Sequence, residues 1–379
     1  MKRLLPVILL ALLSLASGAH ATPHLVPDAP TVDARGYILV DHDSGHVLAE
    51  RNAEEQLEPA SLTKMMTAYV VFSELRAGQI KLDDMVRVSK KAWRMPGSRM
   101  FIEVGTHVSV EQLLKGTIIQ SGNDSSVALA EHVAGSEETF AALMNEHARS
   151  IGMHGTRFTN ATGLPDANHY STARDLARLA TVMIREFPEY YAWYSEKEYT
   201  YGGITQGNRN LLLYRDSTVD GFKTGHTEAA GYCLVASAKR GDMRLISVVM
   251  GTKSESARAS ESQKLINYGF RFFETHKLYD ADQPLKAMRV WKGASETVQL
   301  GLTAPLYITV PRGQYNKLNA SLNVASAIIA PTRKGQNLGT VNVHLGDLML
   351  AERPLIALED VAEGSMWQRL FDNMRMLLQ

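Results

Sequence analysis

A serine and a lysine three positions apart, in Ser61-Leu62-Thr63-Lys64, are the residues of this chain whose types and spacing most directly allow chemistry. On a helix, such positions lie on one face, within reach of each other. A serine hydroxyl is a poor nucleophile unless an adjacent base takes its proton, and a neutral lysine amine can be that base. Because an ordinary lysine is protonated at neutral pH, the pair requires burial and a nearby cation to lower the pKa of Lys64.

A second motif, Ser121-Gly122-Asn123, lies between two predicted helices. Its hydroxyl can relay a proton, and its asparagine amide can hold a peptide bond of a substrate. Alone, this tripeptide is typical of an ordinary loop, just as a lone serine–lysine pair is typical of a solvated helix face. The order of the motifs along the chain therefore matters more than any one of them.

A third motif, Lys223-Thr224-Gly225, stands at the end of a predicted strand. Lys223 can supply the cation near Lys64, and Thr224 can bind a carboxylate. Gly225 has no side chain to obstruct a substrate that lies along the strand edge. Chance seldom produces three such motifs in this order on a helix, a loop and a strand, and together they predict a serine-type hydrolase.

The elements that must position these motifs follow from the hydrophobic periodicity of the chain. Helices are predicted over residues 60–75, 110–120, 125–134, 139–151 and 172–186. Strands are predicted over residues 34–41, 46–51, 219–224, 231–238 and 244–250. The last three strands are joined by turns short enough for antiparallel pairing. Strands, then helices, then strands indicate an α+β fold in which helices flank an antiparallel sheet.

The sequence changes character after residue 274. Short alternating strands, separated by Gly, Pro and Asn, are predicted over residues 297–302, 306–310, 318–324, 340–345 and 348–350. This pattern is typical of a small all-β domain, and a sandwich is expected. The predicted organisation is a signal peptide, a catalytic domain, an all-β domain and a terminal amphipathic helix, over residues 1–21, 22–280, 281–361 and 362–379.

The N-terminus has the features of a secretory signal peptide. Two basic residues precede an apolar run over residues 4–16, and Ala19-His20-Ala21 places small residues where a signal peptidase cleaves. The run is shorter than the roughly 20 apolar residues that span a membrane, so cleavage after Ala21 is expected. The mature protein is then expected outside the cytoplasm, in a bacterial periplasm.

The composition excludes several classes of function. The 379 residues are 45% hydrophobic and 21% charged, which indicates a globular chain long enough for two domains. Lys plus Arg and Asp plus Glu number 40 each, so no basic face for a nucleic acid is expected. The single cysteine, Cys233, excludes an intramolecular disulfide and a Cys-rich zinc site. No H-E-x-x-H or phosphate-loop motif occurs, and we expect neither a metal nor a cofactor.

The three motifs carry a resemblance to a known family. Their order is similar to the S-x-x-K, S-D-N and K-T-G signature of class A β-lactamases and penicillin-binding proteins. Over essentially its whole length the chain resembles the low-molecular-weight penicillin-binding proteins that are D-alanyl-D-alanine carboxypeptidases, and residues 221–227 and 269–274 are also similar to them. Gly122 departs from S-D-N, although carboxypeptidases of the family commonly carry glycine there. The resemblance implies a transpeptidase-like catalytic domain, followed by the β-domain and the helical tail.

The resemblance also implies catalytic roles. It implies that Ser61 is the acylated nucleophile and Lys64 its base, that Ser121 passes the proton to the leaving D-alanine, and that Asn123 orients the substrate amide. The implied activity is removal of the terminal D-alanine from peptidoglycan pentapeptides, through an acyl-enzyme and without a cofactor. Penicillins are expected to acylate Ser61, because their strained amide and carboxylate mimic the terminal dipeptide.

Substrate-binding roles follow from the same resemblance. Lys223 and Thr224 are implied to hold the terminal carboxylate of the substrate. The backbone N–H groups of Ser61 and His226 are implied to form the oxyanion hole, which stabilises the negative charge of the tetrahedral intermediate.

Two arginines are further candidates for the same carboxylate. Arg209, in Asn208-Arg209-Asn210, matches a family arginine that is thought to help bind it, and Arg258 is a weaker candidate of the same kind. The alternative for Arg209 is an ordinary charge on a surface loop.

Three alternatives in function remain open from the sequence. A β-lactamase is one, but the E-x-x-L-N segment of class A enzymes is not found, and such an enzyme needs no β-domain. A DD-endopeptidase that cuts crosslinks is another. A non-catalytic wall-binding protein on an inactive hydrolase scaffold is the third, and the retention of Ser61 beside Lys64 argues against it.

The last segment of the chain predicts an amphipathic helix that lies on a membrane. At 100° per residue its apolar side chains fall in one arc of about 140°; they are Met366, Trp367, Leu370, Phe371, Met374, Leu377 and Leu378. Polar residues fall opposite, with Met376 as the one apolar exception. Charges within the segment exclude a spanning helix, whereas the stripe fits an interfacial one. We expect peripheral attachment to the outer face of the inner membrane; the alternative is a helix packed on the β-domain.

Overall fold

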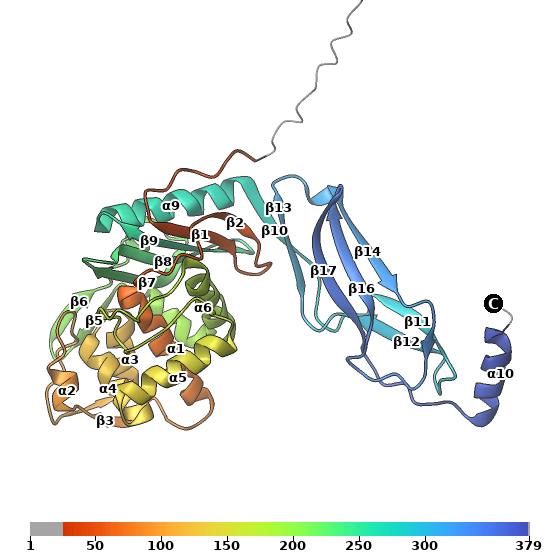
Figure 1. Ribbon diagram of the computed structural model, residues 1–379, viewed down its shortest axis with the longest axis horizontal. Helices are drawn as coiled ribbons and strands as arrows, with labels where there is room; N and C mark the ends of the chain where they lie inside the picture. Colours follow the sequence, from red (N-terminus) through yellow and green to blue (C-terminus); the bar gives the residue numbers. More distant parts are fainter. Residues whose placement is uncertain (1–25, 378–379) are drawn as a thin grey trace, which may run out of the picture.

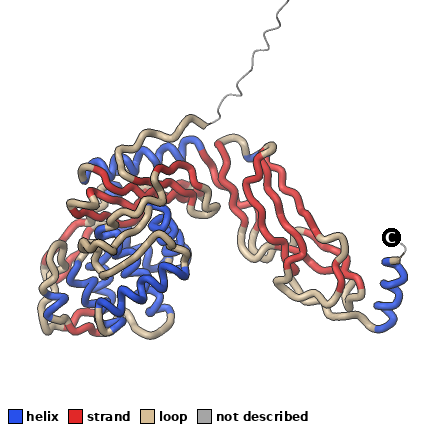
Figure 2. Tube along the Cα trace, viewed as in Figure 1, coloured by secondary structure: helices blue, strands red, loops and turns tan. Residues whose placement is uncertain are grey.

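The computed structural model describes residues 26–377, so the predicted signal peptide lies outside the described residues. Figure 1 shows a larger lobe of helices and sheet, followed by an elongated lobe of strands that ends in a short helix. Helices gather in the first lobe, and the second is mostly strand and loop (Figure 2). The predicted fold class, an α+β domain followed by an all-β domain and a helical tail, is confirmed.

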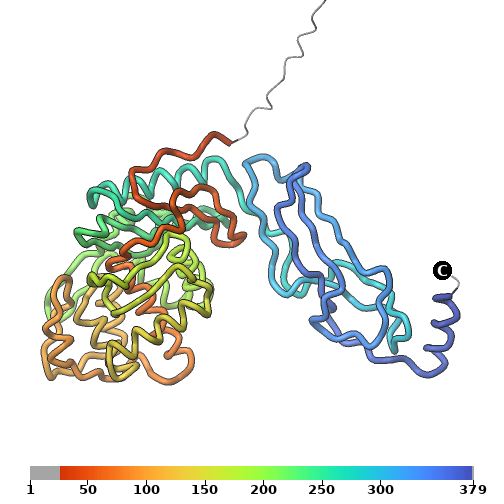
Figure 3. The backbone as a smooth tube through the Cα atoms, in the orientation of Figure 1, coloured from red at the N-terminus to blue at the C-terminus, as the bar shows by residue number. Residues whose placement is uncertain are grey.

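A five-stranded antiparallel sheet is the frame of the first lobe. Its strands in spatial order are β2 (Val47–Arg51), β1 (Gly36–Asp41), β9 (Met243–Thr252), β8 (Gly231–Arg240) and β7 (Val219–Thr227). Strands from the two ends of this lobe pair in the sheet, with Gly36 opposite Met250, and Figure 3 shows the early and late segments side by side. β7 pairs with β8 alone in this sheet, so its outer edge is open to other elements.

Both faces of the sheet are covered by helices. α9 (Glu255–Phe272) packs on one face, and α6 (Ala173–Glu186) packs on the other. Side chains of β1 alternate accordingly, because Ile38 belongs to the core under α6 and Leu39 to the core under α9. A sheet that is buried on both faces gives a rigid support for the residues along its edge.

A bundle of helices lies beyond α6 and contains the first two motifs. Its members are α1 (Thr63–Arg76), α3 (Val110–Ile118), α4 (Asn123–Ala134) and α5 (Glu137–Ser150). α1 is central, since all residues from 63 to 72 are buried. The helix predicted over residues 60–75 is present, although its first three residues form a 3₁₀ turn, Ala60–Leu62.

Shorter elements complete the first lobe. They are β3 (Met85–Arg87), α2 (Lys90–Trp93), β4 (His107–Ser109), α7 (Pro188–Tyr191), the 3₁₀ turn Ala192–Ser195, β5 (Glu198–Tyr201), β6 (Ile204–Gly207) and α8 (Leu212–Arg215). The two small hairpins pair β3 with β4 and β5 with β6.

α9 was not predicted from the sequence. Its first half buries small and charged side chains, among them Arg258, Ala259 and Glu261, instead of a stripe of large apolar ones. Large apolar residues begin only at Leu265. Periodicity therefore gives no helix signal over its first turns.

The second lobe is built from one two-stranded antiparallel sheet and one larger sheet. β10 (Phe273–Tyr279) pairs with β13 (Leu306–Pro311). The larger sheet has the order β14 (Leu318–Val324), β16 (Asn337–Leu345), β17 (Leu348–Ala357), β12 (Thr297–Gly301), β11 (Lys286–Trp291) and β15 (Ile328–Ile329). Its core is apolar, with Val298, Leu300, Val341 and Leu355 completely buried.

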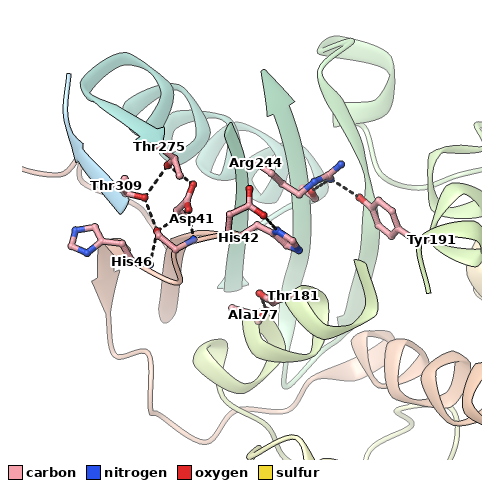
Figure 4. A network of polar contacts seen from close by, with 12 residues as sticks. Asp41, His42, His46, Ala177, Thr181, Tyr191, Arg244, Thr275 and Thr309 are labelled. Carbon is pink, nitrogen blue, oxygen red and sulfur yellow. Dashed lines mark hydrogen bonds and ion pairs between the residues drawn. The ribbon is translucent and has the colours of Figure 1, made fainter. Parts of the chain in front are cut away.

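The two lobes are joined through hydroxyl groups around one buried carboxylate. Asp41, at the end of β1, accepts hydrogen bonds from Ser44 and, at 2.7 Å, from Thr275 of β10. Thr309 of β13 lies 2.8 Å from the Thr275 hydroxyl and 2.6 Å from that of Ser44. Figure 4 shows Asp41 and the two threonines pointing toward one another across the junction. Because Asp41 is fully buried, the four groups tie the β1–β2 turn to the β-domain.

The terminal helix α10 (Met366–Met376) meets the β-domain through a polar contact. One Asp372 carboxylate oxygen accepts the backbone N–H of Lys292 at 2.6 Å, and the other accepts from the Arg289 guanidinium at 3.3 Å. Met376, the apolar exception on the polar side, is half-buried on this same face. Within the described residues, no helix is both long and apolar enough to cross a bilayer.

The apolar stripe of α10 therefore does not pack on the β-domain. Its side chains are between 50% and 87% exposed; they are Met366, Trp367, Leu370, Phe371, Met374 and Leu377. Figure 1 places α10 at the end of the β-domain that is far from the helical lobe.

Candidate active site

Ser61 lies in the 3₁₀ turn that leads into α1, and its side chain is half-exposed. Ala60, directly before it, has a positive φ of 47°, which is unusual for a residue with a side chain and marks a tightly held turn. One turn later, Lys64 places its Nζ 2.9 Å from Ser61 Oγ. The structure thus brings together the two residues whose spacing predicted a nucleophile and its base.

Lys64 is buried without a carboxylate within ion-pair distance among the described residues. Its second contact is the backbone carbonyl of Thr162, which accepts from Nζ at 2.6 Å. Burial is the main cause that lowers the pKa of Lys64 to about 7, and the Arg209 guanidinium lowers it further, whereas the Asp124 carboxylate acts in the opposite direction. A substantial fraction of this amine is therefore neutral at neutral pH, as a base requires.

The second motif stands at the N-terminus of α4. Ser121 has a positive φ of 61° and is 2% exposed. Among residues 26–377 the buried Oγ has no hydrogen-bond partner, so the hydroxyl is free to bind a substrate group. Asn123 is held by the preceding loop, because its Nδ2 donates to the Pro96 carbonyl at 2.6 Å and its backbone N–H to the Ser98 carbonyl at 2.7 Å.

The third motif lies on the edge strand β7, beside the turn that carries Ser61. Lys223 and Thr224 are 3% and 5% exposed. The only hydrogen bond of Lys223 Nζ within the described residues goes to the carbonyl of Thr224, at 3.2 Å. Burial lowers the pKa of Lys223 well below its ordinary value, and the nearby positive charges, Lys64 first, lower it further. Repulsion between two buried amines disfavours the state in which both carry a proton.

The Arg209 guanidinium lowers the pKa of Lys64, and repulsion between Lys64 and Lys223 lowers the pKa of Lys223. The role of Lys223 as the cation near Lys64 stays a prediction. Arg209 is exposed, and its Nη1 donates to Ser98 Oγ at 2.6 Å.

Gly225 is required by backbone packing. A Cβ at this position would lie 2.8 Å from the Pro59 carbonyl oxygen and 3.3 Å from the Ala60 Cβ. The missing side chain therefore lets β7 pack against the Ser61 turn. From the sequence alone, the glycine was explained by the space that a substrate needs along the strand edge.

The other predicted binding residues take different positions. His226 is exposed and its ring stacks on Tyr232 at 3.9 Å, so its side chain points away from the buried lysines. Arg258 is 4% exposed and is used internally: it donates to the carbonyls of Gly225 and Arg209 and pairs with Glu255 at 2.7 Å. Arg258 thus links α9 to β7 and to the loop that contains Arg209.

Two groups that hold the site were not predicted from the sequence. The Thr162 carbonyl contacts Lys64, but a backbone carbonyl carries no sequence signal. Asp124, 1% exposed, accepts the N–H groups of Met100 and Phe101 at 2.8 Å each and so fixes the loop in front of α4. Its place directly after the second motif and directly before the helix predicted over residues 125–134 was the available signal.

The described residues contain no group of three or more His, Cys, Asp or Glu side chains arranged to hold a metal ion. Cys233, on β8, is completely buried, and burial raises the pKa of its thiol to about 11. A buried thiol of this kind packs as a small apolar side chain.

Two protein families match the chain, one for each lobe. Residues 24–254 match the D-alanyl-D-alanine carboxypeptidase family. Residues 273–363 match the family described as the C-terminal domain of penicillin-binding protein 5. The second match begins where β10 begins.

Curated relatives cover nearly the whole chain. D-alanyl-D-alanine carboxypeptidase DacC of Escherichia coli is 49% identical over 357 residues, which are 92% of this chain and 89% of that protein. D-alanyl-D-alanine carboxypeptidase DacA of the same organism is 43% identical over 374 residues, 95% of this chain and 93% of that protein.

Solved structures show the same arrangement. Penicillin-binding protein 5 of Haemophilus influenzae superposes with a TM-score of 0.86 at 42% identity, covering 89% of this chain and 100% of that chain. Penicillin-binding protein D2 of Listeria monocytogenes, solved in an ampicillin-bound form, has a TM-score of 0.60 at 29% identity and covers 64% of this chain and 100% of that chain.

Proposed function

The chain belongs to the D-alanyl-D-alanine carboxypeptidase family, and from that premise we propose that Ser61 is its acylated nucleophile and Lys64 the base that activates it. The prediction of a serine-type D-Ala-D-Ala carboxypeptidase is confirmed by the family match and by relatives that cover most of the chain. The enzyme removes the terminal D-alanine from peptidoglycan pentapeptides through an acyl-enzyme, and β-lactams acylate it. The further proposals concern the residues that do this and the place where they do it.

The contact between Ser61 and Lys64 carries the proposal for the acylation step. The Thr162 carbonyl takes one N–H of the neutral Lys64 amine, which leaves the lone pair available to Ser61 Oγ at 2.9 Å. As Oγ attacks the carbonyl carbon of the scissile bond, its proton passes to Nζ, and the electron pair of the carbonyl moves onto oxygen. The backbone N–H groups of Ser61 and His226 are the proposed donors to that oxyanion.

Ser121 is the proposed relay to the leaving group. Its buried hydroxyl has no other partner among the described residues, so it can pass a proton to the nitrogen of the departing D-alanine. That proton is the one that Lys64 accepted from Ser61. A water molecule then attacks the ester carbonyl and gives a proton to Lys64. As the ester bond to Ser61 Oγ breaks, Lys64 returns this proton to Oγ, so Ser61 is again a free hydroxyl and the shortened peptide leaves as a carboxylic acid.

Lys223 and Thr224 are the proposed ligands of the terminal carboxylate, with Arg209 at the rim. Burial and neighbouring cations lower the pKa of Lys223. A bound carboxylate has the opposite effect, because an opposite charge close to an amine raises its pKa. A substrate carboxylate at this place therefore favours the charged form of Lys223, and only a ligand that carries one gains that ion pair.

We also propose that the enzyme works in the periplasm, attached to the inner membrane by α10. The signal-peptide pattern over residues 1–21 supports export. The outward apolar face of α10, with Trp367 71% and Phe371 59% exposed, supports insertion into the interfacial region of a bilayer. Asp372 holds the opposite face of the helix to the β-domain, which keeps the apolar face directed outward.

A small-substrate assay with matched variants tests the proposed residue roles. Full-length protein is incubated with a diacetylated tripeptide ending in D-Ala-D-Ala, and free D-alanine is measured. Ser61→Ala is expected to abolish release, and Ser121→Ala to lower it by about 10²-fold or more. Ser73→Ala is the control, because this half-buried serine lies on the same helix and only donates to the Tyr69 carbonyl. Undiminished release by Ser61→Ala would contradict the proposal.

A crosslinked dimer muropeptide in parallel separates carboxypeptidase from endopeptidase activity. Release of D-alanine without cleavage of the dimer is expected.

A further inference from the structure

A histidine outside the three motifs, His169, lies buried beneath the turn that carries Ser61. It is 3% exposed, and Phe158 packs edge-on to its ring at 5.7 Å. Burial lowers the pKa of His169 to about 4, with the charge of Lys64 acting in the same direction and that of Asp166 against it. The imidazole is therefore neutral at any pH at which the enzyme works.

The contacts of His169 define which ring nitrogen carries the proton. The backbone N–H of Thr159 donates to Nδ1 at 3.1 Å, so Nδ1 is an acceptor. The single proton of the neutral ring is then on Nε2, which lies 2.8 Å from Thr63 Oγ1 and donates to it. The Thr159 hydroxyl also lies 3.2 Å from Nδ1, so the ring bridges Thr159 and Thr63 with two contacts at Nδ1 and one at Nε2.

These two threonines belong to the two segments that meet at Lys64. Thr63 lies between Ser61 and Lys64 in the first motif. Thr159 begins the loop over residues 159–164, in which the Thr162 carbonyl accepts from Lys64 Nζ at 2.6 Å. His169 is therefore a tie between the helix that carries the base and the loop that orients it.

The loop and the turn are also in direct backbone contact. Gly163 has a φ of 80°, and a Cβ on it would lie only 1.8 Å from the Ala60 carbonyl oxygen. Asn160 fixes the loop from within, because its Oδ1 accepts the N–H groups of Thr162 and Gly163. The loop is consequently preformed, and its place beside α1 depends on a few contacts: those of His169, the Lys64–Thr162 contact and a hydrogen bond from Thr67 to the Ala161 carbonyl.

We propose that His169 is a positioning residue, which holds the 159–164 loop on the Ser61 turn and thereby aims the lone pair of Lys64 at Ser61 Oγ. A neutral amine has two N–H bonds and one lone pair, and the Thr162 carbonyl fixes one of the N–H bonds. If the loop moves, that bond is released, Nζ rotates, and water reaches the amine. The inference rests on the proposed role of Lys64 as the base.

The proposal predicts different effects on the acylation rate constant and on the affinity for a penicillin. The proposed carboxylate ligands Lys223 and Thr224 are on β7, and within residues 26–377 neither forms a hydrogen bond with the residues of the His169 bridge. Loss of the bridge should therefore lower the acylation rate constant and leave the apparent affinity for a penicillin nearly unchanged. Small misplacements of a catalytic group can cost up to about 10²-fold in rate.

Three variants each remove one contact of the bridge, and a fourth variant is the control. His169→Asn keeps an oxygen near the position of Nδ1 and removes the contact to Thr63. His169→Gln keeps a donor near the position of Nε2 and removes the contact to Thr159. Thr63→Val removes the hydroxyl with little change in shape. His154→Asn is the control, because His154 is exposed and lies nearby in the sequence.

The measurement is the acylation of full-length protein by a fluorescent penicillin, followed at several concentrations and from about pH 5 to 10. We expect His169→Asn and Thr63→Val each to lower the limiting rate about tenfold, and the double variant to lower it no further. His169→Gln should retain more activity than His169→Asn. In His169→Asn the midpoint of the pH profile should move upward, because water that reaches Lys64 relieves its desolvation. His154→Asn should match the unaltered protein.

Rates and pH midpoints like those of the unaltered protein in His169→Asn or in Thr63→Val would overturn the positioning role, even if the melting temperature falls. Additive losses in the double variant would also overturn it, because they place the two residues in separate effects. If His169→Asn does not fold, Thr63→Val and His169→Gln carry the test. Failure of the unaltered protein to acylate at Ser61 would instead contradict the proposed function, so the two failures are distinguishable.

Discussion

Helices α1 and α10 depart from the usual distribution of side chains in opposite directions. α1 buries Lys64 to 1% exposure, and α10 leaves Trp367 71% and Leu377 87% exposed. A lysine in the interior and large apolar residues on the surface both cost stability in a protein that has no use for them. The two departures fit the two proposed functions, a base whose charge is suppressed by burial and a surface that an apolar partner covers.

The surroundings of the two helices differ in the same sense. Around Lys64 the protein supplies a carbonyl and a hydroxyl and keeps carboxylates out of ion-pair distance. Around α10 it supplies a carboxylate, Asp372, to hold the polar face and leaves the apolar face uncovered. Each arrangement preserves the unusual property of its helix.

The largest expected effect is the loss of the base. Lys64→Met keeps the length of the side chain and its burial but removes the amine that accepts the Ser61 proton. Acylation by a labelled penicillin should fall by about 10²–10⁴-fold, the range for removal of a general base. Stopped-flow or gel fluorescence measures it, with Lys90→Met on the exposed end of α2 as control. Full acylation by Lys64→Met would contradict the role of Lys64 as the base.

The next largest effect is expected for membrane attachment by the exposed apolar face of α10. A variant that ends at Ala362 should move from the membrane fraction to the soluble fraction and keep its activity on small substrates. Trp367→Ser with Phe371→Ser should weaken attachment in the same direction, because each removes apolar area that a bilayer would bury. Leu348→Ser with Met349→Ser is the matched control, since these residues are also exposed but lie at the β16–β17 turn. If all forms partition equally between the membrane and soluble fractions, α10 is a structural helix and not a membrane anchor.

The pH dependence sharpens the claim about α1. Lys64 must be neutral to act, and its pKa is lowered to about 7. The acylation rate should therefore rise between about pH 6 and 8 and level off above, falling about tenfold per unit on the acid side. The midpoint belongs to the coupled pair of Lys64 and Lys223 when both titrate. A rate that is constant from pH 5 to 9 would exclude a lysine base.

The smallest effect is expected from the polar attachment of α10. Asp372→Asn keeps the shape of the side chain and weakens its contacts with the Lys292 N–H and with Arg289. The loss is about 1 kcal/mol of local stability, because Asp372 is partly exposed. Hydrogen exchange in α10 should become faster while acylation stays unchanged. Unchanged exchange would show that Asp372 does not hold the helix.

The contact between Ser61 and Lys64 could be predicted from the sequence, whereas the surroundings of this pair could not. Ser61 and Lys64 could be paired from helical spacing alone, because the geometry of a helix is local. The contact of Lys64 with the Thr162 carbonyl could not, since it joins residues 98 positions apart through the backbone. Likewise Gly225 was recognised as part of a motif, but the reason for a glycine there, the approach of the Pro59 carbonyl, exists only in three dimensions.

The fold shows the same division. Strands that are continuous apolar runs between short turns, such as β8 and β9, were predicted close to their observed bounds. α9 was not, because tertiary packing of Arg258 and Glu261 replaces the apolar stripe that periodicity needs. β10 was also absent from the prediction, and its place is set by pairing with the distant β13.

Identification of the residue that β-lactams acylate tests the central claim most directly. The full-length protein is treated with a labelled penicillin at neutral pH, digested, and the modified peptide is sequenced by mass spectrometry, with Ser61→Ala treated in parallel. One adduct per chain, located on Ser61 and absent from Ser61→Ala, is the predicted result. An adduct on any other residue, or an equal amount of adduct on Ser61→Ala, would contradict the account.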